Sequence, residues 1–266
     1  VPLLLSAVLF FGKLIVSYRE EKGHATVQKA LLNKSIKLCL WCCLLFIAIP
    51  FGIYFTAFLP LTTLPHNRYD VFGRFIAYQT HMYNYHSTLQ ATHPFESPWY
   101  QWPFDIRNVW YYGNYSADSE GHIRTISVLG NPLFFWVCVP ATVYAFVRAI
   151  KRHSRTALIC VIGFLSAYLP WVLVPRCTFI YHYFTAVPFI LIAFLIAYQR
   201  LEETASLRRV VFTKGAVTLT VGRILLLTCI LVHILMFIAF YPVLTGTLTT
   251  QNYANALEWL PSWFFI

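Results

Sequence analysis

Long apolar runs alternate with polar segments along this chain. The runs cover approximately residues 2–16, 38–59, 127–147, 157–174, 179–198 and 216–240. A helix that crosses a bilayer needs roughly 20 apolar residues, so the runs predict six membrane-spanning helices, the first cut short at its front. Backbone groups in lipid must find hydrogen-bond partners within the segment, which favours helix even for the strand-like stretch "FIYHYF".

The pattern changes in the segment 62–126, which has no apolar run of that length. Its stretch "RYDVFGRFIAYQTHMYNYHSTLQ" predicts an amphipathic helix on the outer membrane surface, because apolar side chains recur near helical spacing. These side chains are Phe72, Phe75, Ile76, Met82 and Leu89. In the following "THPFESPWYQWPF", three prolines rule out a regular helix, and Trp99 and Trp102 suit the membrane interface.

The composition supports a membrane protein. Of the 266 residues, 58% are hydrophobic and only 11% are charged, and the mean hydropathy is +0.60. A soluble domain of this size cannot cover so much apolar surface. The predicted fold class is therefore an all-α multi-pass membrane protein. We expect one transmembrane domain over residues 1–266, with an extracytoplasmic loop over 62–126 that carries the interfacial helix.

The net charge of +10 follows the expected topology. The loops at 17–37, 148–155 and 199–215 are rich in lysine and arginine, whereas the segment 62–126 has no lysine and the tail 241–266 has neither residue. The positive-inside rule places the three basic loops in the cytoplasm. The long loop, the turn around Arg176 and the tail then share the outer face. The charge is a topology signal, so we expect no nucleic-acid partner.

The cysteine and histidine patterns indicate no metal site. Six of the seven cysteines fall within apolar runs, where a free thiol behaves as a small apolar side chain. We therefore expect neither a disulfide framework nor zinc, even at "CLWCC". His81 and His86 are five residues apart and do not share a helix face well enough to form a metal pair.

Arg176 lies in "LPWVLVPRCTFIYHYF", where two predicted spans meet at a short outer turn. An arginine at the membrane edge is a functional-site hypothesis, because its guanidinium group suits a phosphate and stays charged. A lipid-linked phosphate would lie at this depth. The alternative is an arginine that only ends a helix and extends its charge towards water.

Other candidate residues lie on the same outer face. His182, six residues beyond Arg176, could bind a ligand or a neighbouring backbone carbonyl. His93 lies in the proline-rich loop segment, where a functional role is more favoured. None of the outer carboxylates is an obvious general base. They are Asp70, Glu96, Asp105, Asp118, Glu120 and Glu258, and we interpret "NYSADSEGHIR" as a solvated turn.

Four ordered motifs then resemble one family. "HPFESPWYQWPF", "GNPLFFW", "VPRCTFIYHYFTAVPF" and "FYPVLTG…EWLPSWFF" together are similar to the C-terminal half of the protein O-mannosyltransferases, from about Tyr69 to Ile266. The resemblance implies a GT-C membrane fold. It also implies transfer of mannose, with inversion, from a polyprenyl-phosphate carrier (dolichyl phosphate in eukaryotes) to Ser or Thr hydroxyls of exported proteins.

The resemblance assigns roles to individual residues. Arg176 falls at the family's membrane-edge arginine, which implies a role in binding the donor phosphate. The loop motif is expected to shape the pocket, and its residues here are His93, Glu96, Ser97, Trp99 and Trp102, with His182 from the later motif.

Two departures from the family pattern qualify the resemblance. Only "PLTTLPHN" precedes the interfacial helix, where the eukaryotic enzymes insert a soluble MIR domain, so the chain resembles the bacterial type. Nothing here matches the Asp-Glu pair of the family's first outer loop. Because the chain also begins inside an apolar run without a methionine, we expect a piece of a longer protein, with the catalytic base upstream.

The leading hypothesis is thus the donor-binding part of a mannosyltransferase in the plasma membrane, with its active face outside the cytoplasm. Expected partners are polyprenyl-phosphate mannose and a secreted or membrane protein acceptor. Alternatives are a related transferase with another sugar or a lipid acceptor, and a non-catalytic membrane subunit. A transporter is less favoured, because charges and broken helices do not gather at the bilayer midplane. The sequence leaves the oligomeric state open.

Overall fold

The computed structural model describes residues 2–64, 69–89, 91–114, 121–215 and 217–266. Contacts within the chain divide it into two compact units, Leu3–Gln90 and Ala91–Ile266. Asp118 and Glu120, with their predicted turn, lie outside the described residues. That residues 1–266 form one transmembrane domain stays a prediction.

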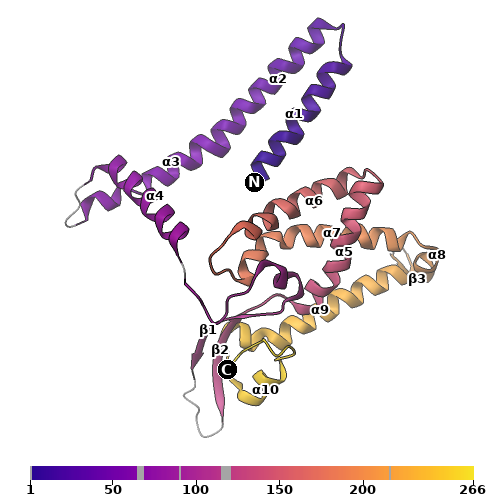
Figure 1. The fold of residues 1–266 in the computed structure, drawn as a ribbon. Coiled ribbons are helices and arrows are strands. Elements are labelled where there is room, and N and C mark those ends of the chain that lie inside the picture. Colours follow the sequence, from indigo (N-terminus) through magenta and orange to yellow (C-terminus); the bar gives the residue numbers. More distant parts are fainter. Residues whose placement is uncertain (1, 65–68, 90, 115–120, 216) are drawn as a thin grey trace. The chain divides into compact units, whose positions relative to one another are not determined.

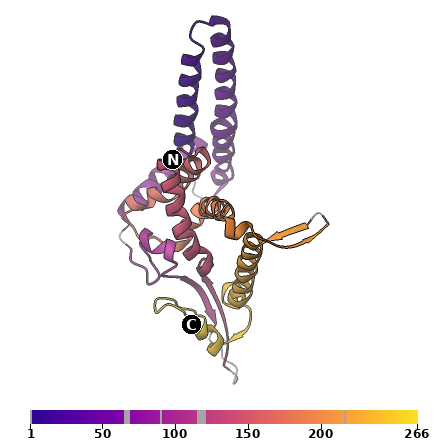
Figure 2. The same ribbon diagram turned by 90° about the vertical axis from the view of Figure 1, so that its right-hand side faces the viewer.

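In the described part of the N-terminal unit, the regular elements are all helices, joined by turns (Figure 1). Its helices are α1 (Pro2–Glu20), α2 (Ala25–Cys43), α3 (Ile49–Thr56) and α4 (Val71–Thr88). Helices α1 and α2 lie side by side and antiparallel (Figures 1 and 2), and Gln28 Nε2 donates a hydrogen bond to the Tyr18 carbonyl across the pair.

A π-helical turn, Leu44–Ala48, joins α2 to α3 without a break. The Ile49 amide donates to the Leu44 carbonyl, five residues back. Pro50 follows, and proline has no amide hydrogen and clashes with the carbonyl four residues before it. The wider turn directly before Pro50 relieves that conflict. With the 3₁₀ turn Pro60–Thr63, the helical segment is long enough to include the predicted span 38–59.

Helix α4 confirms the predicted helix in the long loop. Asp70 caps it, because its Oδ1 accepts a hydrogen bond of 2.7 Å from the Gly73 amide. On one side of α4, the Phe75 ring packs on Phe58 at 5.3 Å and on Tyr54 at 5.8 Å between centroids. This contact buries Phe58. The location of α4 at the membrane surface stays a prediction.

The C-terminal unit consists of a helical bundle, a small sheet and a docked tail. Its helices are α5 (Pro132–Lys151), α6 (Arg155–Tyr168), α7 (Val187–Glu202), α8 (Ala205–Arg208), α9 (Val221–Thr245) and α10 (Gln251–Ala256). Its strands are β1 (Val109–Asn114), β2 (His122–Val128), β3 (Val210–Lys214), β4 (Val217–Thr220) and β5 (Thr249–Thr250). Helices α5, α6 and α7 pack on one another, and β3 and β4 form an exposed hairpin (Figures 1 and 2).

Five helical segments within the described residues are long and apolar enough to cross a membrane. They are Ala25–Thr63, Pro132–Lys151, Arg155–Leu173, Ile180–Glu202 and Val221–Thr245. Each overlaps one of the predicted spans. The remaining predicted span, 2–16, coincides with helix α1, and its crossing of a membrane stays a prediction.

The predicted start of the third span was wrong. Ser127 lies in β2, and α5 begins only at Pro132. Asn131 sets this boundary, because its Oδ1 accepts a hydrogen bond from the Phe134 amide at 3.2 Å. Pro132 then occupies the first helical position, where its missing amide hydrogen costs nothing.

The sheet and the tail form a second packing layer in this unit. Strands β1 and β2 pair antiparallel, with Val109 opposite Val128 and Asn114 opposite Arg124, and β2 pairs with the short β5. The order is β1-β2-β5. Side chains of β2, α9 and the tail share a buried cluster. Its members are Ile123, Leu129, Phe240, Val243, Ala254, Leu257, Trp263 and Phe265.

Candidate functional site

The connection between α6 and α7 is an irregular segment, as the Arg176 turn predicts. Helix α6 ends at Tyr168 and continues as a 3₁₀ turn, Leu169–Leu173. A non-helical stretch then leads to a second 3₁₀ turn, Ile180–Ala186, before α7. Pro170 accounts for the end of α6, because a proline has no amide hydrogen to donate to the carbonyl four residues before it. Arg176 lies in the middle of the non-helical stretch.

This stretch is joined to the proline-rich loop segment by a pair of hydrogen bonds. The Ser97 amide donates to the Thr178 carbonyl at 2.8 Å. In return, Thr178 Oγ1 donates to the Ser97 carbonyl at 2.9 Å. Both residues are buried. The loop motif and the Arg176 turn, 81 residues apart at this contact, are therefore one local structure, which we call the junction.

Trp102 anchors the junction through its indole nitrogen. Its Nε1 donates to the Ser97 carbonyl at 3.1 Å and lies 3.0 Å from Ser97 Oγ. Only 1% of its surface is exposed, so the ring packs inside the protein, and its depth relative to the membrane interface stays a prediction. An indole N–H that has internal acceptors is satisfied within the protein and needs no contact with water. Trp99 is half-buried, and its carbonyl accepts a hydrogen bond from the Tyr168 hydroxyl at 2.8 Å.

His182 lies between tryptophan rings. Its ring centroid is 4.0 Å from Trp171 and 5.9 Å from Trp102. Its Nδ1 lies 3.1 Å from the amide nitrogen and 2.9 Å from the carbonyl oxygen of Phe179. The sequence left open a ligand or a backbone partner for His182, and the structure shows the backbone partner.

His93 and Glu96 form a tight turn at the exposed edge of the junction. The His93 amide donates to Glu96 Oε2 at 3.3 Å, and the Glu96 amide donates to the His93 carbonyl at 2.9 Å. The His93 ring packs edge-on against Phe179 at 5.1 Å. His93 is exposed, so this edge of the junction is open to a ligand.

Arg176 is the free cation of this junction. It is half-buried, and it makes no ion pair or hydrogen bond to any residue that the structure describes. Its charge lies close enough to Tyr181 and His182 to interact with both. Because an arginine side chain is always protonated, this is a positive charge on a pinned backbone without a protein counter-ion. The arrangement can hold an anion.

The described carboxylates that the sequence predicts for the outer face each accept a hydrogen bond from a backbone amide. Asp70 caps α4, and Glu96 accepts from His93. Glu258 Oε1 accepts from the Phe265 amide at 2.9 Å within the tail. Asp105 Oδ1 accepts from the Gly130 amide at 3.2 Å. Each of these four therefore has one carboxylate oxygen oriented by a backbone amide.

Asp105 is the residue whose environment the sequence did not reveal. It is fully buried, and its Oδ2 has no hydrogen-bond partner among the described residues. Burial raises its pKa to about 8, although the hydrogen bond from Gly130 lowers it in part. Its place between the apolar Phe104 and Ile106 is the one sequence signal that could have indicated burial.

No group of three or more possible metal-ligating side chains occurs in the described ranges. The seven cysteines are free thiols. The junction thus places the charge of Arg176 near the aromatic rings of Tyr181 and His182, an arrangement that suits an anion.

Comparison with protein families gives one model match. Residues 71–263 match the model described as the C-terminal four-transmembrane region of protein O-mannosyltransferase. The match includes every junction residue described above.

Curated relatives are named polyprenol-phosphate-mannose–protein mannosyltransferase. The protein of Corynebacterium glutamicum is 26% identical over 196 residues, which are 71% of this chain and 36% of that protein. The protein of Mycolicibacterium smegmatis is 25% identical over 287 aligned positions, which cover 96% of this chain and 54% of that protein. The chain thus spans about a third to a half of the length of these two relatives.

A solved structure shares the fold. The structure of the Saccharomyces cerevisiae protein O-mannosyltransferase Pmt1–Pmt2 complex bound to the sugar donor superposes with a TM-score of 0.57 at 21% identity. The likeness covers 76% of this chain and 28% of that one. At this identity the likeness concerns the fold alone, and it confirms the predicted multi-pass GT-C architecture.

Proposed function

The chain belongs to the protein O-mannosyltransferase family, and on that basis we propose that it is the donor-binding part of an enzyme. The reaction would move mannose from a polyprenyl-phosphate carrier to Ser or Thr hydroxyls of exported proteins. The observation that carries this proposal is Arg176, a cation without a partner among the described residues, on the backbone that Ser97 and Thr178 hold in place.

Mannose transfer needs two contributions from the protein: stabilisation of the leaving phosphate and a base for the acceptor hydroxyl. The bond between the sugar carbon and the donor phosphate oxygen breaks as the acceptor oxygen bonds to that carbon, so negative charge grows on the leaving phosphate. A guanidinium group with several donors stabilises that charge. Arg176 would do this at the edge of the membrane, with the polyprenyl tail in lipid.

The acceptor hydroxyl must also lose its proton to a base. The four described outer carboxylates are engaged by backbone amides, and Asp105 is enclosed. We therefore place the base in residues upstream of this chain. The chain alone is then catalytically incomplete.

The remaining junction residues would shape the pocket. Ser97 and Trp102 fix the backbone that carries Arg176, and their contacts are internal. His93, Glu96 and Trp99 form the rim where the sugar or acceptor would approach. His182 would support the rim through its ring contacts with Trp171 and Trp102. No metal is part of this proposal.

The proposed setting is the plasma membrane with the junction on the extracytoplasmic side. The lysine-free loop and tail support that orientation. The acceptor would be a secreted or membrane protein, and the oligomeric state is outside this proposal.

The test is an assay of the longer protein that contains this chain, extended by the residues encoded upstream. Purified protein would be supplied with polyprenyl-phosphate mannose and a Ser/Thr-rich peptide, and mannosylated peptide would be measured by mass spectrometry. Parallel reactions with polyprenyl-phosphate glucose, and with a lipid acceptor in place of the peptide, separate the related transferases. Transfer only to lipid, or only from the glucose donor, would overturn the proposal, and inactivity with all donors would favour a non-catalytic subunit.

A further inference from the structure

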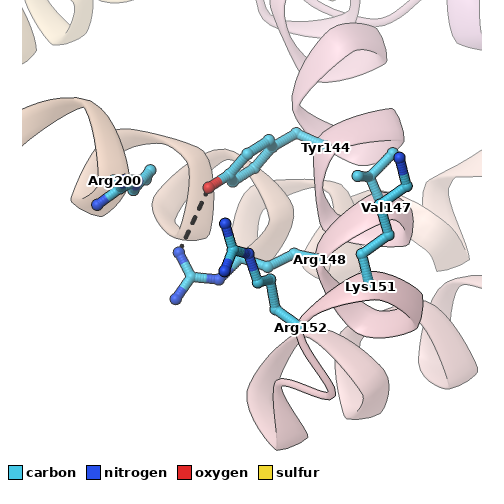
Figure 3. Close-up of a pocket in the computed structure, with 6 residues that line it drawn as sticks. All are labelled: Tyr144, Val147, Arg148, Lys151, Arg152 and Arg200. Carbon is cyan, nitrogen blue, oxygen red and sulfur yellow. Dashed lines mark hydrogen bonds between the residues drawn. The ribbon is translucent and has the colours of Figure 1, made fainter.

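A basic pocket lies at the end of the bundle opposite to Arg176. It is a cavity of about 520 Å³ between the last turns of α5 and α7 (Figure 3). It is lined by Tyr144, Val147, Arg148, Lys151, Arg152 and Arg200. Four of these six side chains are cationic and none is acidic.

The side chains of two of the four cations, Lys151 and Arg152, make no hydrogen bond or ion pair to any residue that the structure describes. Arg148 makes one hydrogen bond in the described structure, from its guanidinium group to the Tyr144 hydroxyl at 3.4 Å. Its Nε is buried with no partner among the described residues. Arg148 and Arg152 line the pocket from the end of α5, and Arg200 lines it from α7 (Figure 3). Adjacent like charges are unfavourable unless an anion lies between them.

One carboxylate lies near the pocket. Glu203 forms an ion pair with Arg200 at 2.6 Å, and both side chains are exposed. That pair offsets one of the four cations. The other three retain a net positive charge, and the buried Arg148 Nε adds a donor that bulk water does not reach.

Two apolar grooves continue from this pocket along α5. One, of about 530 Å³, shares Val147 and Lys151 with the pocket and continues past Val143 to Val139. The other, of about 350 Å³, shares Tyr144 and Arg200 and continues towards Val137 along α7. From Lys151 to Val139 is about 18 Å at helical rise, close to the depth of one leaflet's hydrocarbon.

We propose that this pocket and its two grooves bind an anionic phospholipid, with the phosphate among the arginines and an acyl chain in each groove. Basic pockets between membrane helices are suited to anionic headgroups. The paired grooves favour a two-chain lipid over a free phosphate ion. The pocket lies at the C-terminal end of the predicted membrane span Pro132–Lys151. A lipid headgroup would lie at this depth. This inference does not rest on the proposed function.

The experiment uses the longer protein in detergent and measures lipid binding by native mass spectrometry. Dioleoyl phosphatidylglycerol and dioleoyl phosphatidylcholine are compared, because they share acyl chains and differ in net charge. The test variant is Arg148→Gln with Arg152→Gln. The matched control is Arg155→Gln, an exposed cation of the same loop outside the pocket.

The wild type is expected to prefer phosphatidylglycerol. Each cation near an anionic headgroup contributes roughly fivefold in affinity, so the double variant should bind about 30-fold more weakly. The Arg155→Gln control should bind as the wild type does. Equal binding of the two lipids, or equal loss in the control and the double variant, would overturn the proposal.

Two further measurements distinguish a bound phospholipid from a bound inorganic anion. Val143→Trp fills a groove and should weaken phosphatidylglycerol binding while leaving the arginines intact. Inorganic phosphate that displaces the lipid at equal concentration, with no effect of Val143→Trp, would show an anion site and contradict a phospholipid site. If Arg148 proves necessary for folding, Lys151→Gln with Arg152→Gln removes two exposed cations and should show the same loss.

Discussion

At the scale of the residue, Arg176 combines three properties that rarely occur together. Its backbone is held through Ser97 and Thr178, its side chain is half-buried, and it has no counter-ion in the described structure. An arginine that only ends a helix and extends its charge towards water needs a half-buried side chain but no hydrogen-bonded backbone around it. The hydrogen-bonded backbone around Arg176 therefore supports a binding role.

The first prediction concerns the paired N–H donors of the Arg176 guanidinium group. Arg176→Lys keeps the charge and removes the paired donors that match a phosphate. Loss of a charged hydrogen bond of about 1.5–3 kcal/mol should lower kcat/KM for the lipid-linked donor by roughly 10- to 100-fold. Membrane insertion should not change. Arg155→Lys is the control, and wild-type donor kinetics in Arg176→Lys would rule out a phosphate fork.

Asp105 is a second residue with a measurable consequence. Its pKa is about 8 in the folded chain and near 3.8 when unfolded. Between these values the folded state holds a proton that the unfolded state lacks, so the free energy of unfolding falls as pH rises from about 4 to 8. Below about pH 4 the free energy of unfolding no longer depends on Asp105, and above about pH 8 its fall is complete.

Asp105→Asn should remove this pH dependence. The amide keeps an acceptor for the Gly130 N–H and never ionises. Thermal unfolding in detergent should show a gain on the order of a few kcal/mol for the variant at pH 9 and little change at pH 4. Glu20→Gln, at an exposed carboxylate, serves as control. A pH profile unchanged by Asp105→Asn would contradict a buried, neutral Asp105.

At the scale of the element, the contact between α6 and α7 depends on a glycine. A Cβ at Gly163 would lie 2.1 Å from Phe189 Cε1, so only hydrogen lets the Phe189 ring lie against α6. The Cys160 thiol adds a hydrogen bond to the Phe189 carbonyl at 3.2 Å across the same pair. This contact positions the two helices that the Arg176 segment connects.

Gly163→Ala should therefore destabilise the bundle by about 1–3 kcal/mol, as overpacking does. Phe189→Leu removes the ring atoms that would clash. In the double variant the two costs should not add, and a double-mutant cycle of thermal unfolding should show favourable coupling. Additive costs would mean that Gly163 and Phe189 do not meet in the folded protein.

The elements also show how far the sequence predicts this fold. The spans, helix α4 and the Arg176 turn follow from hydrophobic period and proline positions, which are local signals. Strands β1 and β2 were not predicted, although "NVWYYGN" and "HIRTISV" have residues that favour strands. Their pairing depends on distant partners, because Asn108 Nδ2 and Oδ1 bond to the Phe264 backbone, 156 residues away.

At the scale of the whole molecule, the C-terminal tail packs against the segment that contains the proline-rich loop motif. Trp263 Nε1 donates to the Asp105 carbonyl at 2.7 Å, and the Phe264 ring packs on Phe95 at 5.8 Å. Motifs that are far apart in the sequence thus meet around one junction. The sequence indicated their common face from charge asymmetry alone and could not give the contacts, which depend on side-chain packing between distant segments.

We propose that the donor-binding cation and the catalytic base lie in different parts of a longer protein. In that proposal the chain supplies the donor-side cation, and the described carboxylates predicted for the outer face each accept a hydrogen bond from a backbone amide or are buried. An inverting transfer without a base would be slow, since general base catalysis contributes typically about 10²- to 10⁴-fold. The base should come from the upstream part of a longer protein.

The most direct test compares the isolated chain with that longer protein. Both would be purified in the same detergent and supplied with polyprenyl-phosphate mannose and the acceptor peptide, and donor binding and mannose transfer would be measured on each. The account predicts that both bind the donor and that only the longer protein transfers mannose. Transfer by the isolated chain at the rate of the longer protein would contradict it.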